Sequence, residues 1–191
     1  PGEAGCTGRG VFAGHPAAYH PPPLVARRGA AMSEERAFAH PSEYGRDYAA
    51  MFGRAAPALV TALSIIALAP GTVAFHCSAG KDRTGVLAAA LLLSLGVADA
   101  EIVADYGDTA PNIDAIHERI RPVMSVLMAR LGIDLDAAAQ AAASDQKFDE
   151  YAMVQMLELL RERHGDPLTP LREVGLTESL LAVLRAKARA A

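Results

Sequence analysis

Apolar residues recur every three or four positions through most of the chain, and this period predicts helices. The first predicted helix begins near Ser42 and carries on one face Tyr44, Tyr48, Met51 and Phe52. A second helix is predicted over residues 55–68, where Pro57 falls in the first turn and is tolerated. The segment that follows these two helices, residues 71–75, lacks the helical period.

Residues 71–75 form a short apolar run with β-branched members, preceded by Pro70, a pattern typical of a buried strand in a parallel sheet. Residues 84–95 then show a helical pattern, and Gly96 is a natural stop for it. A loop within residues 76–85 joins the strand to the helix. The sequence therefore predicts an α/β fold in which a central parallel sheet is flanked by helices.

The second half of the chain is predicted to be helical throughout. Helices are expected over 99–106, from Pro111 to Gly132, and over 148–163, 168–174 and 178–188. In the helix expected from Pro111 to Gly132, five apolar residues form a stripe typical of a helix packed on one side: Ile113, Ile116, Ile120, Val123 and Leu127. Pro122 lies inside this stripe and should kink the helix or split it in two.

The loop at 76–85 carries the clearest chemistry. Cys77 and Arg83 stand six positions apart at the start of a helix, where successive backbone N–H groups can point at a tetrahedral oxyanion. Ala79 and Gly80 leave the inner side of the loop free of bulk. The planar guanidinium of Arg83 can bind two phosphate oxygens at once. The pattern predicts a phosphate-binding loop around a thiol.

Positive surroundings of this kind favour the thiolate form of Cys77. They can lower a cysteine pKa by about 1 to 5 units from its free value of about 8.5. We therefore expect Cys77 to act as a nucleophile that takes a phosphoryl group and forms a phosphocysteine intermediate. His76 is expected behind the loop, holding the cysteine backbone, and Thr84 is expected to stabilise the thiolate with its hydroxyl.

The remaining loop residues are expected to contact substrate. Backbone N–H groups from Ser78 to Arg83 would face the phosphate, and Lys81 would reach it with its charge, although a solvated lysine fits the same position. The predicted substrate-binding residues are His76, Ser78, Ala79, Gly80, Lys81 and Thr84.

Residues 76–85 resemble the HCxxGxxR(S/T)G signature of cysteine-dependent phosphatases, in the HC(S/T/F)AGKDRTG form of the bacterial tyrosine phosphatase family. Residues 102–106 resemble its I-V-x-D-Y segment, and residues 151–184 are similar to its closing helices, so the resemblance covers roughly residues 40–191. It implies hydrolysis of phosphate monoesters without a metal or organic cofactor. It implies a phosphotyrosine protein as substrate, with a phosphoinositide or a dual-specificity substrate as the alternative.

Other strings of that family are absent. Its members carry N-F-R-D-L-G-G and Y-R-S segments and a strand ending in D-L-R upstream of the nucleophile, whereas the 76 residues before Cys77 contain none of them. We therefore expect a C-terminal portion of a longer protein or a truncated gene product. It would comprise an irregular, mobile segment over 1–35 and a partial catalytic domain over 36–191 that lacks its first strands.

The D-L-R aspartate, which the family is thought to use as proton donor, is missing as well. Asp82 lies in the loop and is predicted to serve as proton donor or water-orienting base; the alternative is that it only anchors the loop. Asp47 stands 30 residues before the nucleophile, where some smaller cysteine phosphatases carry their acid, but its helical pattern argues against it. Asp105 and Tyr106 are expected to pack near the loop as supporting residues.

Composition limits the partners and the location. With 191 residues, 51% of them hydrophobic, the chain fits one domain, and its net charge of −4 argues against nucleic acid as a partner. The longest runs without charge or proline are too short to span a bilayer, so no transmembrane segment is expected. The two cysteines imply no disulfide framework, and no signal peptide is visible. We therefore expect a cytoplasmic protein, with secretion left open because the sequence does not fix the true N-terminus.

Three other interpretations remain. Truncation could leave a phosphate-binding module without turnover. A sulfur- or arsenic-handling enzyme could have a similar anion loop, but the Lys81-Asp82 pair and the position of the loop deep in the chain argue against it. A zinc site formed by Cys6, His15 and His20 matches no standard spacing and lacks a fourth ligand.

Overall fold

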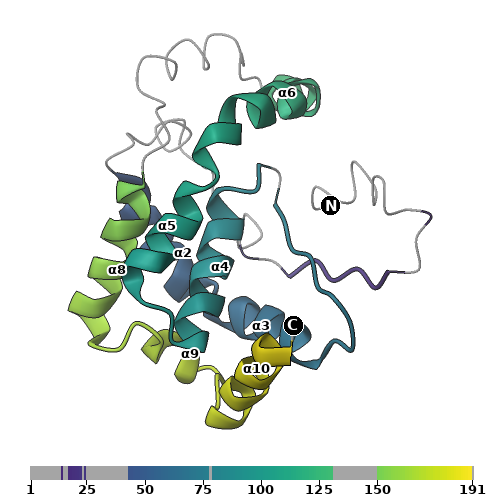
Figure 1. The fold of residues 1–191 in the computed structure, drawn as a ribbon. Coiled ribbons are helices and arrows are strands. Elements are labelled where there is room, and N and C mark those ends of the chain that lie inside the picture. Colours follow the sequence, from purple (N-terminus) through teal and green to yellow (C-terminus); the bar gives the residue numbers. More distant parts are fainter. Residues whose placement is uncertain are drawn as a thin grey trace.

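The computed structural model of the chain describes residues 14, 17–22, 24, 43–77, 79–130 and 150–190. Within them the chain forms a body of helices (Figure 1). In chain order the helices are α2 (Tyr44–Arg54), α3 (Ala56–Leu68), α4 (Asp82–Leu95), α5 (Asp99–Gly107), the 3-10 helix η4 (Ala110–Asn112), α6 (Ile113–Arg130), α8 (Tyr151–His164), α9 (Thr169–Arg172) and α10 (Glu178–Ala190).

The hydrophobic core lies where α2, α3, α4 and α8 meet. α4 contacts α2, α3, α5 and α10, and it lies in the middle of the body in Figure 1. α2 makes its main packing contact with α8. The side chains that are essentially inaccessible to solvent include Phe52, Leu59, Leu63, Val86 and Met156. The helix that follows the loop is therefore held on several sides by apolar packing.

The helices predicted from periodicity are confirmed, with ends that differ by a few residues. On α2 the predicted apolar face is largely buried, since Tyr48 and Phe52 are 2% and 0% exposed. α4 ends where expected, because Gly96 takes a positive φ of 85°. The backbone N–H groups of Gly96 and Val97 then bond to the carbonyls of Leu93 and Leu92, both at 3.0 Å. These two bonds form the Schellman motif that glycine favours at a helix end.

The central parallel sheet expected from the sequence is wrong for the described part of the chain, which contains no strand. Residues 72–77, where the strand was expected, run as an irregular segment between α3 and α4 (Figure 1). Val73, Phe75 and Cys77 are half-buried while the residues between them are exposed. This alternation has the period of a strand. A strand also needs a hydrogen-bonded neighbour, however, and no described segment pairs with this one.

Helix α10 fixes the segment that leads into the loop. The Lys187 ammonium donates to the carbonyl oxygen of Ala69 at 2.6 Å and to that of Gly71 at 3.1 Å. The first carbonyl lies just past the end of α3, where helix carbonyls lack partners within the helix. The turn after α3 is thereby tied to the C-terminal helix.

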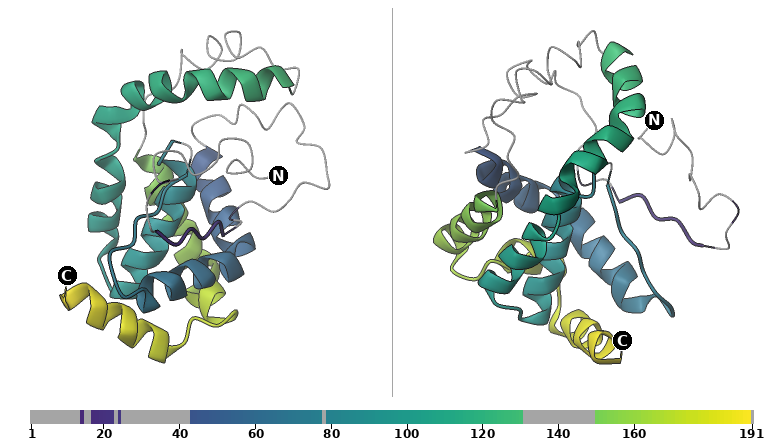
Figure 2. Two further views of the ribbon diagram at one scale, coloured as in Figure 1. Left: turned by 90° about the vertical axis from the view of Figure 1, so that its right-hand side faces the viewer. Right: turned by 45° about the horizontal axis from the view of Figure 1, so that its top comes forward.

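Helix α6 runs through Pro122 as a single helix, so the split that the sequence allowed does not occur. Figure 2 shows α6 extending away from the rest of the helical body. Ile113, Ile116 and Ile120 of the predicted stripe are only half-buried. The side chains of Val123 and Leu127 lie outside the described part, as does Gly132.

Several other predictions fall on residues that are not described. They include Cys6 and His15 of the considered zinc site, most of the segment 1–35, and the start of the helix expected at 148. In the part that is described, no three histidine, cysteine or carboxylate residues cluster as metal ligands. No single described helix is both long and apolar enough to cross a membrane; α2 and α3 meet that criterion only as a pair bent by 74°.

Candidate active site

Cys77 lies at the end of the irregular segment, and its half-buried thiol faces the first turn of α4. The hydroxyl and the backbone N–H of Thr84, together with the backbone N–H of Gly80 in the loop, lie close enough to the sulfur to lower the pKa of the thiol. In the first turn of a helix such N–H groups have no carbonyl partner within the helix. The thiol therefore takes donors that the helix itself leaves unpaired.

The pKa of Cys77 is lowered by these contacts. Burial alone would raise it, but the Thr84 hydroxyl, the Thr84 N–H, the charge of Arg83 and the Gly80 N–H together outweigh burial and favour the thiolate. Thr84 Oγ1 is shielded from solvent, and no partner among the described residues meets the distance and angle limits of a hydrogen bond to it. The roles of Cys77, Arg83 and Thr84 in a reaction stay predictions.

Gly80 makes the turn that closes the loop. Its φ is 73°, in the left-handed region that side chains with a Cβ rarely adopt, and no atom lies within 4 Å of the place where a Cβ would stand. Glycine is therefore required here by the backbone conformation and not by crowding. Ala79 beside it is half-buried, and Ser78 lies outside the described residues.

Lys81 is directed toward α2. Its ammonium lies 3.5 Å from Asp82 Oδ1 and 4.9 Å from the centre of the Tyr44 ring, a cation–π arrangement. His76 is exposed, and its Nδ1 lies 3.0 Å from the carbonyl oxygen of Cys77. The imidazole thus contacts the cysteine backbone, as expected, but from a position open to solvent.

Asp82 opens α4 and receives a hydrogen bond from another helix. The hydroxyl of Tyr48 on α2 donates to Asp82 Oδ1 at 2.5 Å. The same hydroxyl lies 3.0 Å from that of Tyr106 on α5. Burial, followed by the charge of Asp82, raises the pKa of Tyr48 well above its ordinary value, so the phenol remains a proton donor. These contacts fit the anchoring role considered for Asp82 and leave its chemical role to be tested.

Sequence reasoning missed the part that Tyr48 plays, because Tyr48 counted only as one apolar position of the first helix. A usable signal was present: a phenol on the buried face of a helix needs a polar partner. Tyr106 was expected near the loop, and the structure places it there. Asp47 is exposed on α2, and its charge acts on Tyr44.

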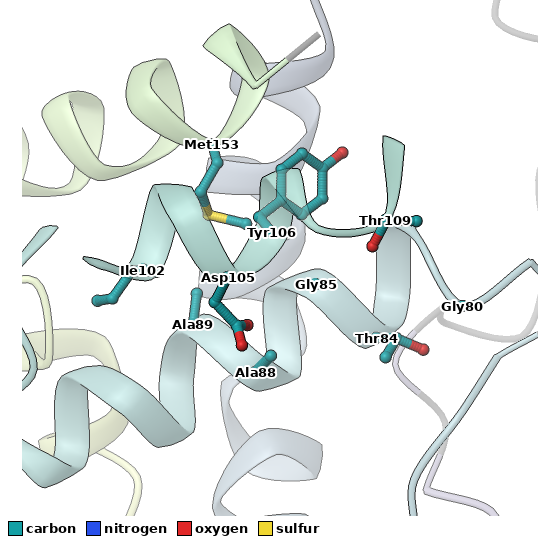
Figure 3. A pocket seen from close by; sticks show the side chains of 10 residues that line it. All are labelled: Gly80, Thr84, Gly85, Ala88, Ala89, Ile102, Asp105, Tyr106, Thr109 and Met153. Carbon is teal, nitrogen blue, oxygen red and sulfur yellow. The ribbon is translucent and has the colours of Figure 1, made fainter. Parts of the chain in front are cut away.

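A small pocket lies behind the loop (Figure 3). Thr84 lines it from the loop side, and Asp105, Tyr106 and Thr109 line it from α5 and the turn that follows. Its volume is about 60 Å³. A cavity that holds a benzene ring measures about 150 Å³, so this pocket is too small for an aryl group. The substrate of this loop would therefore approach from another side.

Gly85 of α4 packs closely against Tyr106 of α5. A Cβ at this position would lie 2.9 Å from two ring carbons of Tyr106. That ring cannot easily move, because Tyr106 is 5% exposed and its hydroxyl is bonded to Tyr48. The glycine that ends the loop motif is thus explained by the close approach of a tyrosine.

Gly85→Ala is expected to destabilise the chain by about 1–3 kcal/mol, because the new methyl group overpacks this contact. Gly53→Ala on α2 is the matched control, since nothing lies within 4 Å of its added Cβ. Gly53 is the last but one residue of α2, where the change should stabilise by at most about 0.5–1 kcal/mol, the value for a helix interior. Urea unfolding of both variants measures the difference. Equal midpoints for the two would contradict the proposed packing.

The fold and the loop define a helical protein with an activated thiol at a helix N-terminus, next to an arginine. Residues 15–190 match the tyrosine phosphatase family. The chain is 31% identical over 155 residues to a tyrosine-protein phosphatase of Nostoc commune. The aligned region covers 77% of this chain and 49% of that protein. It is 60% identical over 35 residues to a putative tyrosine-protein phosphatase of Cupriavidus necator, covering 18% of this chain and 13% of that protein.

The family match extends over most of the chain, and the chain therefore belongs to the tyrosine phosphatase family. It spans about half the length of the relative from Nostoc commune. No solved structure matches it.

Proposed function

We propose that the chain hydrolyses phosphate monoesters through a phosphocysteine intermediate, with phosphotyrosine proteins as substrates. The observation that carries the proposal is the lowered pKa of Cys77, produced by Thr84, Arg83 and Gly80 at the start of α4. The family match and the names of the two relatives support phosphatase activity. A phosphoinositide or dual-specificity substrate remains the alternative.

In the first proposed step, the Cys77 sulfur attacks phosphorus and the bond from phosphorus to the leaving oxygen breaks. Arg83 and the loop N–H groups stabilise the equatorial oxygens as charge shifts. Asp82 is proposed to give the leaving oxygen a proton. In the second step a water oxygen attacks phosphorus, Asp82 takes the water proton, and the sulfur leaves as a thiolate. The two Thr84 donors stabilise that thiolate.

The positive charge that the reaction needs comes from Arg83 and the helix N-terminus, so the proposal includes no metal or organic cofactor. Lys81 is proposed to contact the substrate. To do so, its ammonium group would have to move away from Asp82 and from the Tyr44 ring. The chain spans about half the length of the relative from Nostoc commune. A chain that binds phosphate but does not turn over substrate is therefore the alternative to the proposed hydrolase. Vanadate binding without hydrolysis of an aryl phosphate would identify that outcome.

Alkylation of Cys77 by iodoacetate tests the lowered pKa. A thiol whose pKa is lowered is ionised at a lower pH, so the alkylation rate should reach half its maximum below pH ~8.5, the ordinary cysteine value. Inorganic phosphate or vanadate should slow the reaction by covering the sulfur. The experiment uses a Cys6→Ser chain, so that Cys77 is the one cysteine present. A midpoint at or above ~8.5 would contradict the thiolate assignment.

Thr84→Val in the same background is the matched variant. It removes the side-chain donor and keeps the backbone N–H, so it should move the midpoint upward without abolishing protection by vanadate. An unchanged midpoint would show that the Thr84 hydroxyl does not act on the thiol.

A further inference from the structure

Three helices meet in one hydrogen-bond network next to the loop. Tyr48 of α2 is 2% exposed, and its hydroxyl contacts Asp82 of α4 and Tyr106 of α5. The rings of the two tyrosines pack edge to face, with centroids 6.2 Å apart. The two tyrosines are therefore enclosed, whereas the Asp82 side chain, at the other end of the network, is 41% exposed.

The direction of the hydrogen bonds follows from the number of protons. A phenol carries one proton, and that of Tyr48 goes to Asp82 Oδ1, which accepts it. The Tyr106 hydroxyl must therefore donate to Tyr48 across the 3.0 Å contact. This gives a directed chain from Tyr106 through Tyr48 to Asp82.

We propose that Tyr48 is a positioning residue for the phosphate-binding loop, acting through Asp82, and that Tyr106 orients its hydroxyl. Asp82 is the first residue of α4, so holding it fixes the turn from which Arg83 and Thr84 act on the thiol. The inference rests on the proposed function, because its kinetic test needs turnover. It does not depend on whether Asp82 transfers a proton or only anchors the loop.

A second contact from α2 supports this role. Tyr44, one turn before Tyr48 and stacked on it with centroids 6.4 Å apart, lies beneath the Lys81 ammonium. Two successive loop residues, Lys81 and Asp82, are thus held by two successive tyrosines of one helix. The contacts reach the loop on its α2 side, so they add no bulk at Gly80, where the space next to the backbone is open.

Tyr48→Phe tests the proposal, because it keeps the ring and removes the hydroxyl. We expect kcat/KM on an aryl phosphate to fall about ten- to a hundredfold, the usual effect of removing a hydrogen bond to a charged group. In an Asp82→Ala background, which removes the acceptor that asparagine would retain, the same change should add less than about a twofold loss, since both variants break one interaction. Should Tyr48→Phe fail to fold, Tyr106→Phe removes the next hydroxyl of the chain and is measured in the same cycle.

Ser94→Ala is the control for stability. Ser94 lies on α4, the helix that begins with Asp82, but far along it from the loop. It is 0% exposed, and its hydroxyl donates to the Ala90 carbonyl at 2.7 Å. It should change the melting temperature and leave kcat/KM within about twofold of the parent. Losses in Tyr48→Phe and Asp82→Ala that multiply in the double variant would overturn the proposal, and so would wild-type kinetics in Tyr48→Phe.

The alkylation rate of Cys77 separates this inference from the proposed function. If the full chain shows no turnover, the proposed function fails, but the same cycle can be measured on the iodoacetate rate and on protection by vanadate in the Cys6→Ser chain. Coupling between Tyr48 and Asp82 in those rates supports the positioning role. Independent effects in those rates refute it.

Discussion

Cys77→Ser is expected to lower kcat on an aryl phosphate by about 10⁴-fold or more, the scale seen when an activated nucleophile is removed. A serine hydroxyl stays protonated at neutral pH, whereas the pKa of the Cys77 thiol is held down by Thr84, Arg83 and Gly80. The donors of the loop remain in the variant, so vanadate should still bind. Initial rates on p-nitrophenyl phosphate and a vanadate titration measure the two effects.

Cys6→Ser is the matched control for this variant, because Cys6 is the other cysteine of the chain and stands outside the loop motif. It should retain the activity of the parent. Unchanged activity in Cys77→Ser would rule out the phosphocysteine mechanism. Loss of both turnover and vanadate binding would instead indicate a damaged loop.

Asp82→Asn is expected to slow an alkyl phosphate far more than p-nitrophenyl phosphate. General acids contribute about 10²- to 10⁴-fold when the leaving oxygen is strongly basic, and little when it leaves easily as an anion. The Asp82 side chain is 41% exposed, so a leaving group can reach it. The measurement is kcat/KM on both esters, because a binding defect common to the two cancels in the ratio.

Asp47→Asn serves as the control carboxylate. Asp47 is exposed on α2, where it affects the pKa of Tyr44, and its removal should leave the ratio of the two substrates unchanged. Equal losses on both esters in Asp82→Asn would assign Asp82 to anchoring the loop through Tyr48 and Lys81. The proton donor would then have to be another group.

Helices were predictable from the sequence because their signals are local. The spacing of Tyr48 and Phe52, the early Pro57 and the terminal Gly96 each act within a few residues of the chain. The sheet was not predictable from such signals. The alternation of half-buried and exposed side chains in residues 72–77 shows only which side chains face the core. A strand is defined by backbone pairing with a distant segment, which this alternation does not determine.

The same limit applies to the site. Cys77, Arg83 and Thr84 belong to one contiguous motif, so their meeting could be expected from their spacing. Tyr48 lies 34 residues from Asp82 and 58 from Tyr106, and no local pattern connects them. Helix packing alone brings these three residues together.

The close approach of Tyr106 to Gly85 bears on how relatives of this chain can diverge. A side chain at position 85 would need the space that the ring occupies, since its Cβ would stand 2.9 Å from that ring. A smaller residue at position 106 would free that space but would also remove the hydroxyl that orients Tyr48. The two positions are therefore expected to change together in evolution or to stay fixed together.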